Sequence, residues 1–223
     1  MTTENKPKAR RYWGCLLAVL FVSSVLLNLL LGGVTYFSSD EEETQIEERL
    51  LYGKKKSPNK IAVIRAEGPL LEQLDGHILK QIEQCVRDDK VKAVVLRVDS
   101  PGGTIGASEE IHRELLRLRD GAHPRFPGKT AKPIFASYGS IAASGGYYIS
   151  MPAEKIYAEP TTLTGSIGVY ASLPNVAEFS KQHGIKMELI KAGDIKGSGS
   201  PFHEMTPAER QPWQEMVDQA YDH

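Results

Sequence analysis

The sequence predicts an α/β fold with a mostly parallel β-sheet, and three observations indicate it. Short β-branched runs such as 91–100 (VKAVVLRVDS) are typical of buried strands. Longer stretches such as 70–89 place apolar residues at helical spacing. The two patterns alternate from about residue 60 onward, which is the order that a parallel sheet with crossover helices requires.

Each element is predicted from its own local pattern. The expected strands are 60–68, 91–100, 134–139, 155–159, 165–172 and 186–193, and the expected helices are 70–89, 106–119, 175–183 and one from 207, with a further helix beginning near Ser144. Thr206 is a good N-cap for the last helix, and Pro207 suits its first position. Since the chain stops at His223 without a helix cap, we expect a fragment of a longer protein.

Composition narrows the functional classes. The 223 residues are 41% hydrophobic and 25% charged, with a formal net charge of -1, so nucleic acid is not an expected partner. Cys15 lies in an apolar run and Cys85 in an amphipathic helix pattern, where it is expected to be a core residue. The sequence contains no CxxC pair and no disulfide framework. No metal or cofactor is expected.

The N-terminus predicts a membrane anchor. No charged residue occurs from Trp13 to Phe37, and a span needs about 20 apolar residues. Basic residues precede this run and acidic ones follow it, which orients the N-terminus towards the cytoplasm. The expected organisation is a cytoplasmic tail (1–11), a single transmembrane anchor in contact with lipid (12–37), a juxtamembrane linker (38–59) and an extracytoplasmic domain at the cell membrane (60–223).

Two loops that follow expected strands are candidates for chemistry. In 99–104 (DSPGGT), glycines leave backbone N–H groups bare to hold an anion, although a tight turn alone explains the pattern equally well. In 142–148 (AASGGYY), Ser144 precedes two glycines, which are poor helix residues unless something approaches closely. Ser144 is either a nucleophile or a helix cap.

A nucleophilic serine needs a base. None of the six histidines follows a strand in the way that Ser144 does, and the G-x-S-x-G pattern is absent. A lysine can serve if burial lowers its pKa, and Lys196, in a small glycine-rich loop after 186–193, is the candidate. Lys191 is a competitor, and a solvated role for either lysine is the common alternative.

Four stretches in order, DSPGG, AASGGYYIS, TGSIGV and IKAGDIKGSGSPF, resemble the signal peptide peptidase A family, also called protease IV. The resemblance implies membrane-bound serine peptidases with a ClpP/crotonase-like fold that assemble into homo-oligomers. It implies Ser144 as nucleophile, Lys196 as general base, Ser166 as the residue that orients Lys196, and the N–H groups of Gly103 and Gly145 as the oxyanion hole. The family pattern differs here at Asp194, which we expect to point away from Lys196.

Three functions therefore remain open. The first is a membrane-anchored serine endopeptidase whose Ser-Lys dyad hydrolyses signal-peptide remnants or other short hydrophobic peptides. The second is a crotonase-type enzyme acting on acyl-CoA, which gives Ser144 no role. The third is a non-catalytic, membrane-tethered scaffold of the same fold.

Overall fold

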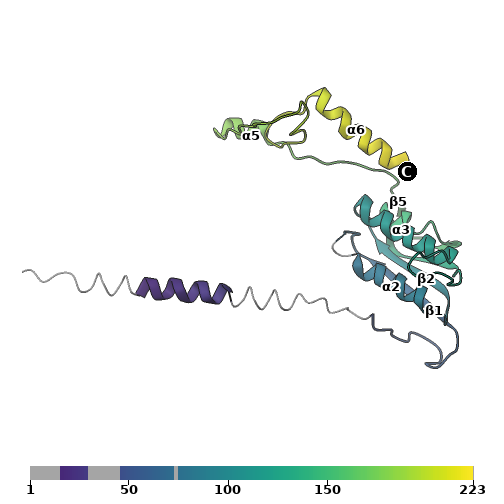
Figure 1. Ribbon diagram of the computed structural model, residues 1–223. Helices are drawn as coiled ribbons and strands as arrows, with labels where there is room; N and C mark the ends of the chain where they lie inside the picture. Colours follow the sequence, from purple (N-terminus) through teal and green to yellow (C-terminus); the bar gives the residue numbers. More distant parts are fainter. Residues whose placement is uncertain (1–15, 30–45, 73–74, 223) are drawn as a thin grey trace, which may run out of the picture. The chain divides into compact units, whose positions relative to one another are not determined.

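In the computed structural model, residues 16–29, 46–72 and 75–222 are described. The chain consists of two separate units, Met1–Leu51 and Tyr52–His223. The second unit contains a β-sheet with helices against it (Figure 1). This unit carries all of the predicted site residues.

The sheet is parallel throughout its described pairings. Its strands are β1 (Lys60–Glu67), β2 (Val91–Ser100), β3 (Ile134–Ala143) and β4 (Lys155–Tyr157), hydrogen-bonded in that order, and β5 (Leu163–Gly165), which pairs with the end of β3. The predicted α/β class with a mostly parallel sheet is therefore confirmed. β4 pairs with the beginning of β3, at Phe135–Ser137, and β5 with its end, at Ile141–Ala143.

Two helices bury one face of the sheet. The helices α2 (Gly76–Arg87) and α3 (Ile105–Asp120) pack on each other, and α2 also packs on β1 (Figure 1). Residues of helices and strands that are almost fully buried form the core: Ile64, Ile82, Val94, Leu96, Val98, Ile111, Leu115, Ile134 and Ala136. On the opposite face of β1, Ile61 is 66% and Val63 37% exposed, so burial alternates along this strand.

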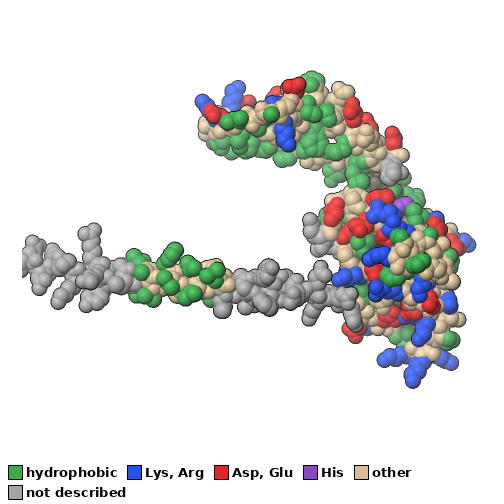
Figure 2. Space-filling model, in the orientation of Figure 1, with side chains coloured by type: hydrophobic (Ala, Val, Ile, Leu, Met, Phe, Trp, Pro, Cys, Tyr) green, Lys and Arg blue, Asp and Glu red, His purple; other side chains and the backbone are tan. Residues whose placement is uncertain are grey.

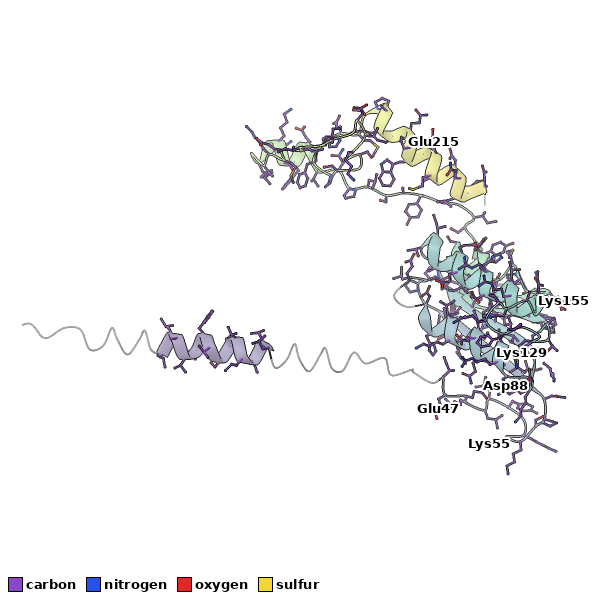
Figure 3. All side chains as sticks on the ribbon, in the orientation of Figure 1. Glu47, Lys55, Asp88, Lys129, Lys155 and Glu215 are labelled. Atoms are coloured by element: carbon purple, nitrogen blue, oxygen red, sulfur yellow. The ribbon has the colours of Figure 1, made fainter. Side chains whose placement is uncertain are left out.

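The buried side chain of Lys132 caps the C-terminal end of helix α2. The Lys132 side chain is 1% exposed, and its Nζ donates to the carbonyls of Cys85, Val86 and Asp88. Lys129 Nζ lies 2.9 Å from Asp89 Oδ1 at the same helix end, near which Figure 3 labels Lys129 and Asp88. The carbonyls of Cys85 and Val86 lie in the last turn of α2 and have no partner within the helix, so the ammonium supplies them with a donor, while the Asp88 carbonyl also accepts from the N–H of Val91.

The outer edge of β1 is partly covered by a side chain. The N–H of Arg65 donates to Gln81 Oε1 at 3.0 Å, and Gln81 Nε2 donates to the Arg65 carbonyl at 3.4 Å. The amide of Gln81, from α2, therefore pairs with one residue of the edge strand as a neighbouring strand would.

The strands expected at 186–193 and 165–172 are both wrong, since β5 covers Leu163–Gly165 and shares only Gly165 with the second of them. β5 ends at Gly165, and residues 185–191 form no strand among the described residues. Met187, Leu189 and Ile190 are 58%, 53% and 98% exposed (Figure 2 shows hydrophobic side chains at the surface of this part). A strand pattern needs a neighbouring strand to bond its backbone, and here none is supplied.

Three helices follow β3. They are α4 (Gly145–Tyr148), α5 (Ala177–Gln182) and α6 (Pro207–Asp222). The start of α6 is a capping box, in which the N–H of Thr206 donates to Glu209 Oε2 at 3.0 Å and that of Glu209 to Thr206 Oγ1 at 3.3 Å. The predicted N-cap at Thr206 is therefore confirmed.

Of the expected anchor 12–37, residues 16–29 are helical with exposed apolar side chains, and 12–15 and 30–37 lie outside the described residues. Within the part of the chain that the structure describes, no helix combines the length and the hydropathy needed to cross a membrane. Cys15 also lies outside the described residues, whereas Cys85 is a core residue as expected.

Candidate active site

Ser144 occupies a strained turn between β3 and α4. Its backbone angles are φ 51° and ψ -123°, a region that residues with a side chain rarely adopt. Its side chain makes no capping hydrogen bond, although it stands at the N-cap position of α4. The alternative of Ser144 as a simple helix cap is therefore wrong, and the strain, of about 1–3 kcal/mol, points to a functional position.

The two glycines after Ser144 allow close packing. A Cβ on Gly146 would lie 2.8 Å from the Ser100 carbonyl oxygen, and a Cβ on Gly145 would collide with Ser108 Oγ. Both residues are buried. The glycine pair therefore lets α4 lie directly against β2 and α3, and this contact fixes the turn that carries Ser144.

Irregular pairing shapes the end of β3. Val98 pairs with Tyr138, but Ser100 pairs with Ala142, so β3 contains extra residues opposite Asp99. Asp99 Oδ1 accepts from the N–H of Ile141 at 3.1 Å inside this bulge. Bulges redirect a strand near active sites.

The bulged end of β3 is also bonded to β5. Thr164 Oγ1 donates to the Ala142 carbonyl at 2.8 Å, and the N–H of Ser144 donates to the Gly165 carbonyl, also at 2.8 Å. The backbone of Ser144 is therefore held against the end of β5.

The DSPGGT loop lies against the Ser144 turn. Gly102 has φ +96°, and a Cβ there would lie 2.7 Å from the Gly145 nitrogen. The loop is bonded to Leu70, whose N–H donates to the Gly102 carbonyl and whose carbonyl accepts from Thr104. None of these bonds uses the N–H of Gly103. Gly145 is the first residue of α4, so its N–H has no acceptor inside that helix. Two predicted oxyanion donors therefore occupy adjoining segments.

A groove of about 750 Å³ joins these elements. It is lined by Leu71, Pro101, Gly102, Gly103, Thr104, Ser144, Ser166, Ile167, Gly168, Val169 and Tyr170. The structure thus brings Ser144, Gly103 and Ser166 together around one open space. The walls supplied by Leu71, Ile167 and Val169 are apolar, and the sequence had not identified them.

Ser166 shares the unusual backbone of Ser144. Its φ is 54°, and among the described residues these two serines are the non-glycine residues with positive φ. Ser166 follows β5 directly and faces the same groove. The sequence pattern carries no signal for this strain, because serine is ordinary in turns.

Lys196 does not line this groove. It lies exposed in the turn 194–199. Asp194 is also exposed, and Lys191 Nζ donates to the Asp194 carbonyl at 2.6 Å, so the competing lysine is bonded to the loop itself. The role of Lys196 as general base, and that of Ser166 in orienting it, therefore stay predictions.

The comparisons with known proteins match the region that holds these residues. The profile of Peptidase family S49 matches residues 128–223, which include Ser144, Ser166 and Lys196. "Protease 4" of Haemophilus influenzae is 33% identical over 198 residues, covering 86% of this chain and 30% of that protein. "Putative signal peptide peptidase SppA" of Enterococcus faecium is 35% identical over 203 residues, covering 87% of this chain and 56% of that protein.

The chain therefore spans between about a third and a little over half of these two relatives. Among solved structures, "ClpP1 from Listeria monocytogenes" is 18% identical with a TM-score of 0.32, covering 41% of this chain and 46% of that one. Residues 128–223 belong to peptidase family S49, and the chain as a whole is a relative of the proteins named protease 4 and SppA.

Proposed function

We propose that the chain is a membrane-anchored serine endopeptidase that uses Ser144 and Lys196 to hydrolyse short hydrophobic peptides, signal-peptide remnants among them. The observation that carries the proposal is the strained Ser144 beside two backbone N–H groups, in a groove with partly apolar walls. The family match and the relatives named as proteases support it.

In the proposed reaction, Ser144 Oγ attacks the carbonyl carbon of the scissile bond and its proton passes to Lys196 Nζ. The N–H groups of Gly103 and Gly145 stabilise the oxyanion that forms. The Lys196 ammonium then gives the proton to the leaving amine, and water cleaves the acyl-enzyme. Ser166 would hold the amine with a hydroxyl, which adds no charge that would raise the pKa of the lysine.

Assembly into a homo-oligomer is part of the proposal. A lysine acts as a base near neutral pH only when burial lowers its pKa, and Lys196 is exposed in the single chain. The exposed apolar residues Met187, Leu189 and Ile190, which precede Lys196 in the chain, offer a surface that a second copy can cover. A ClpP/crotonase-like assembly of parallel-sheet domains suits this arrangement.

The anchor at 12–37 would place the domain at the outer face of the cell membrane, next to hydrophobic peptides left in the bilayer. The exposed apolar helix at 16–29 supports an anchor. In membranes from cells expressing the full chain, alkaline carbonate should leave the protein in the pellet. Release into the supernatant would overturn the anchor without touching the proposed chemistry.

Substitution of the dyad tests the chemistry. With a fluorogenic apolar peptide and the full chain in detergent, Ser144→Ala and Lys196→Ala should each lower kcat by at least about 10³-fold. Lys191→Ala is the matched control, five residues away, and should stay within about twofold. Retained activity in Ser144→Ala would refute the peptidase assignment, and retained activity in Lys196→Ala would refute the dyad.

A further inference from the structure

The helix that follows Ser144 is too short to hold a strained turn by itself. α4 has 4 residues, and a single helical turn is not stable alone, because nucleation fixes several residues for one hydrogen bond. The N–H of Tyr148 donates to the Ser144 carbonyl at 2.9 Å and closes this turn. Whatever fixes Tyr148 therefore also fixes the backbone of Ser144.

Tyr148 is fixed by helix α3. Its hydroxyl donates to Glu109 Oε2 at 2.6 Å, and its ring lies against His112, with ring centroids 4.4 Å apart. Both partners lie on the first half of α3, which begins directly after the Gly103–Thr104 segment. Burial and the bond to Glu109 raise the pKa of Tyr148 to about 12, so the hydroxyl remains a proton donor at physiological pH.

The contact joins the two segments that supply the oxyanion donors. Gly145 begins α4, and Gly103 stands two residues before α3. A hydrogen bond between the far end of α4 and the second turn of α3 therefore restrains the spacing of these two N–H groups. Such donors act only when they are held 2.7–3.1 Å from the oxyanion.

We infer that the Tyr148–Glu109 pair is a positioning device for the nucleophile turn and the oxyanion donors, acting through backbone placement rather than through contact with substrate. The inference rests on the proposed peptidase function. Neither residue lines the groove, so the pair should affect the transition state more than the binding of the ground state.

Kinetics of single and double variants test the pair. Tyr148→Phe removes the hydroxyl and keeps the ring, and it should lower kcat about tenfold with KM within twofold, the size expected for loss of a hydrogen bond to a carboxylate. Glu109→Ala should do the same, and Tyr148→Phe/Glu109→Ala should be no worse than either. Glu109→Gln keeps an acceptor and should recover most of kcat.

The matched control is Tyr147→Phe, which removes a hydroxyl from the neighbouring position of α4 and should stay within twofold. A Tyr148→Phe enzyme with unchanged kcat, or with an effect confined to KM, would overturn the inference. So would effects of the two single variants that multiply in the double variant.

Amide hydrogen exchange tests the pair independently of catalysis. In Tyr148→Phe, the amides of Ser144 and Tyr148 should exchange about tenfold faster, and those in the middle of α3 should not change. If the wild-type chain hydrolyses no peptide, the proposed function fails while this measurement still decides the positioning role. Unchanged exchange at both amides would overturn that role.

Discussion

The sheet region, residues 60–165, and the C-terminal region, residues 166–222, bury their apolar residues very differently. Among described residues, the buried hydrophobic core ends at Ile149, and the buried residues of the C-terminal region are Ser180 and Glu209. The sheet region thus builds the surroundings of Ser144 from its own packing. Lys196 has no comparable surroundings in the single chain, so its role in the proposal depends on added protein surface.

The two regions also differ in the surroundings of one lysine in each, Lys132 and Lys196. Lys132 is buried, and burial lowers its pKa, yet its ammonium is committed to the carbonyls that end α2. Lys196 is exposed and is the proposed base. Burial alone therefore does not identify a catalytic lysine, because a buried ammonium bonded to several carbonyls has no lone pair to offer.

Truncation of one side chain in each region gives the largest expected difference. Leu115→Ala in the core of α3 should lower the free energy of unfolding by about 3 kcal/mol, since it leaves a cavity. Ile190→Ala, at a residue that is 98% exposed, should change it by less than about 0.5 kcal/mol. Urea unfolding of both variants measures this, and equal losses would contradict the contrast between the regions.

The next effect concerns the loop beside Ser144. Gly102→Ala places a Cβ 2.7 Å from the Gly145 nitrogen at φ +96°, so it should displace the donors and lower kcat about 100-fold. Gly76→Ala is the control, because a Cβ there meets nothing within 4 Å. Peptide hydrolysis by both variants is the measurement, and a fully active Gly102→Ala enzyme would show that the loop does not hold the oxyanion.

Substitution of Lys132 and of Lys196 should affect different properties, stability in the first case and activity in the second. Lys132→Met should lower the free energy of unfolding by about 2 kcal/mol, because it removes the ammonium that donates to the buried carbonyls of Cys85 and Val86 at the end of α2. Lys196→Met should change stability by less than about 0.5 kcal/mol while it abolishes hydrolysis. Thermal unfolding beside an activity assay separates the two outcomes, and a strongly destabilised Lys196→Met would argue for a structural role.

The smallest effect is a pH dependence at the start of α2. Asp75 is 3% exposed and its Oδ2 lacks a hydrogen-bond partner among the described residues. Burial, and then the charge of Glu110, raise the pKa of Asp75. A raised pKa in the folded state means that the group supports folding below about pH 4 and that this support is lost as the pH rises.

Asparagine has no carboxyl group to ionise, so the Asp75→Asn variant should not lose stability in this way as the pH rises. The variant should therefore gain stability relative to the wild type between pH 3 and pH 7, by less than about 1 kcal/mol. Urea unfolding at several pH values measures the difference. A gain that shrinks as the pH rises would mean that the carboxylate is stabilised, not penalised, in the fold.

The elements that the sequence predicted well are those whose pattern depends on one buried face. The expected strand 91–100 and helix 106–119 agree with β2 and α3 to within a residue, because the β-branched run and the helical spacing reflect which residues meet the core. The strand expected at 186–193 is wrong because such a strand needs a neighbouring strand to pair with, and the described residues supply none.

The candidate site, too, could be predicted from the sequence only in part. Ser144 was singled out from its own loop, and Gly103 and Ser166 followed from the family resemblance. All three share one groove, but the positive φ of both serines and the apolar groove walls depend on contacts between distant segments. The Tyr148–Glu109 bond spans 39 residues and leaves no periodic signal. Lys132 lies in a loop rich in proline and glycine, where a lysine is normally solvated.

The amide of Gln81 has a consequence for how copies of this domain can meet. By occupying both backbone groups of Arg65, it interrupts the row of donors and acceptors along β1 that a foreign strand would need for continuous pairing. Growth of one sheet into another across that border is therefore discouraged. Copies of the domain are therefore expected to associate through side-chain contacts, which can be reversible and specific. Pairing of one β1 edge with another would instead lead to aggregates.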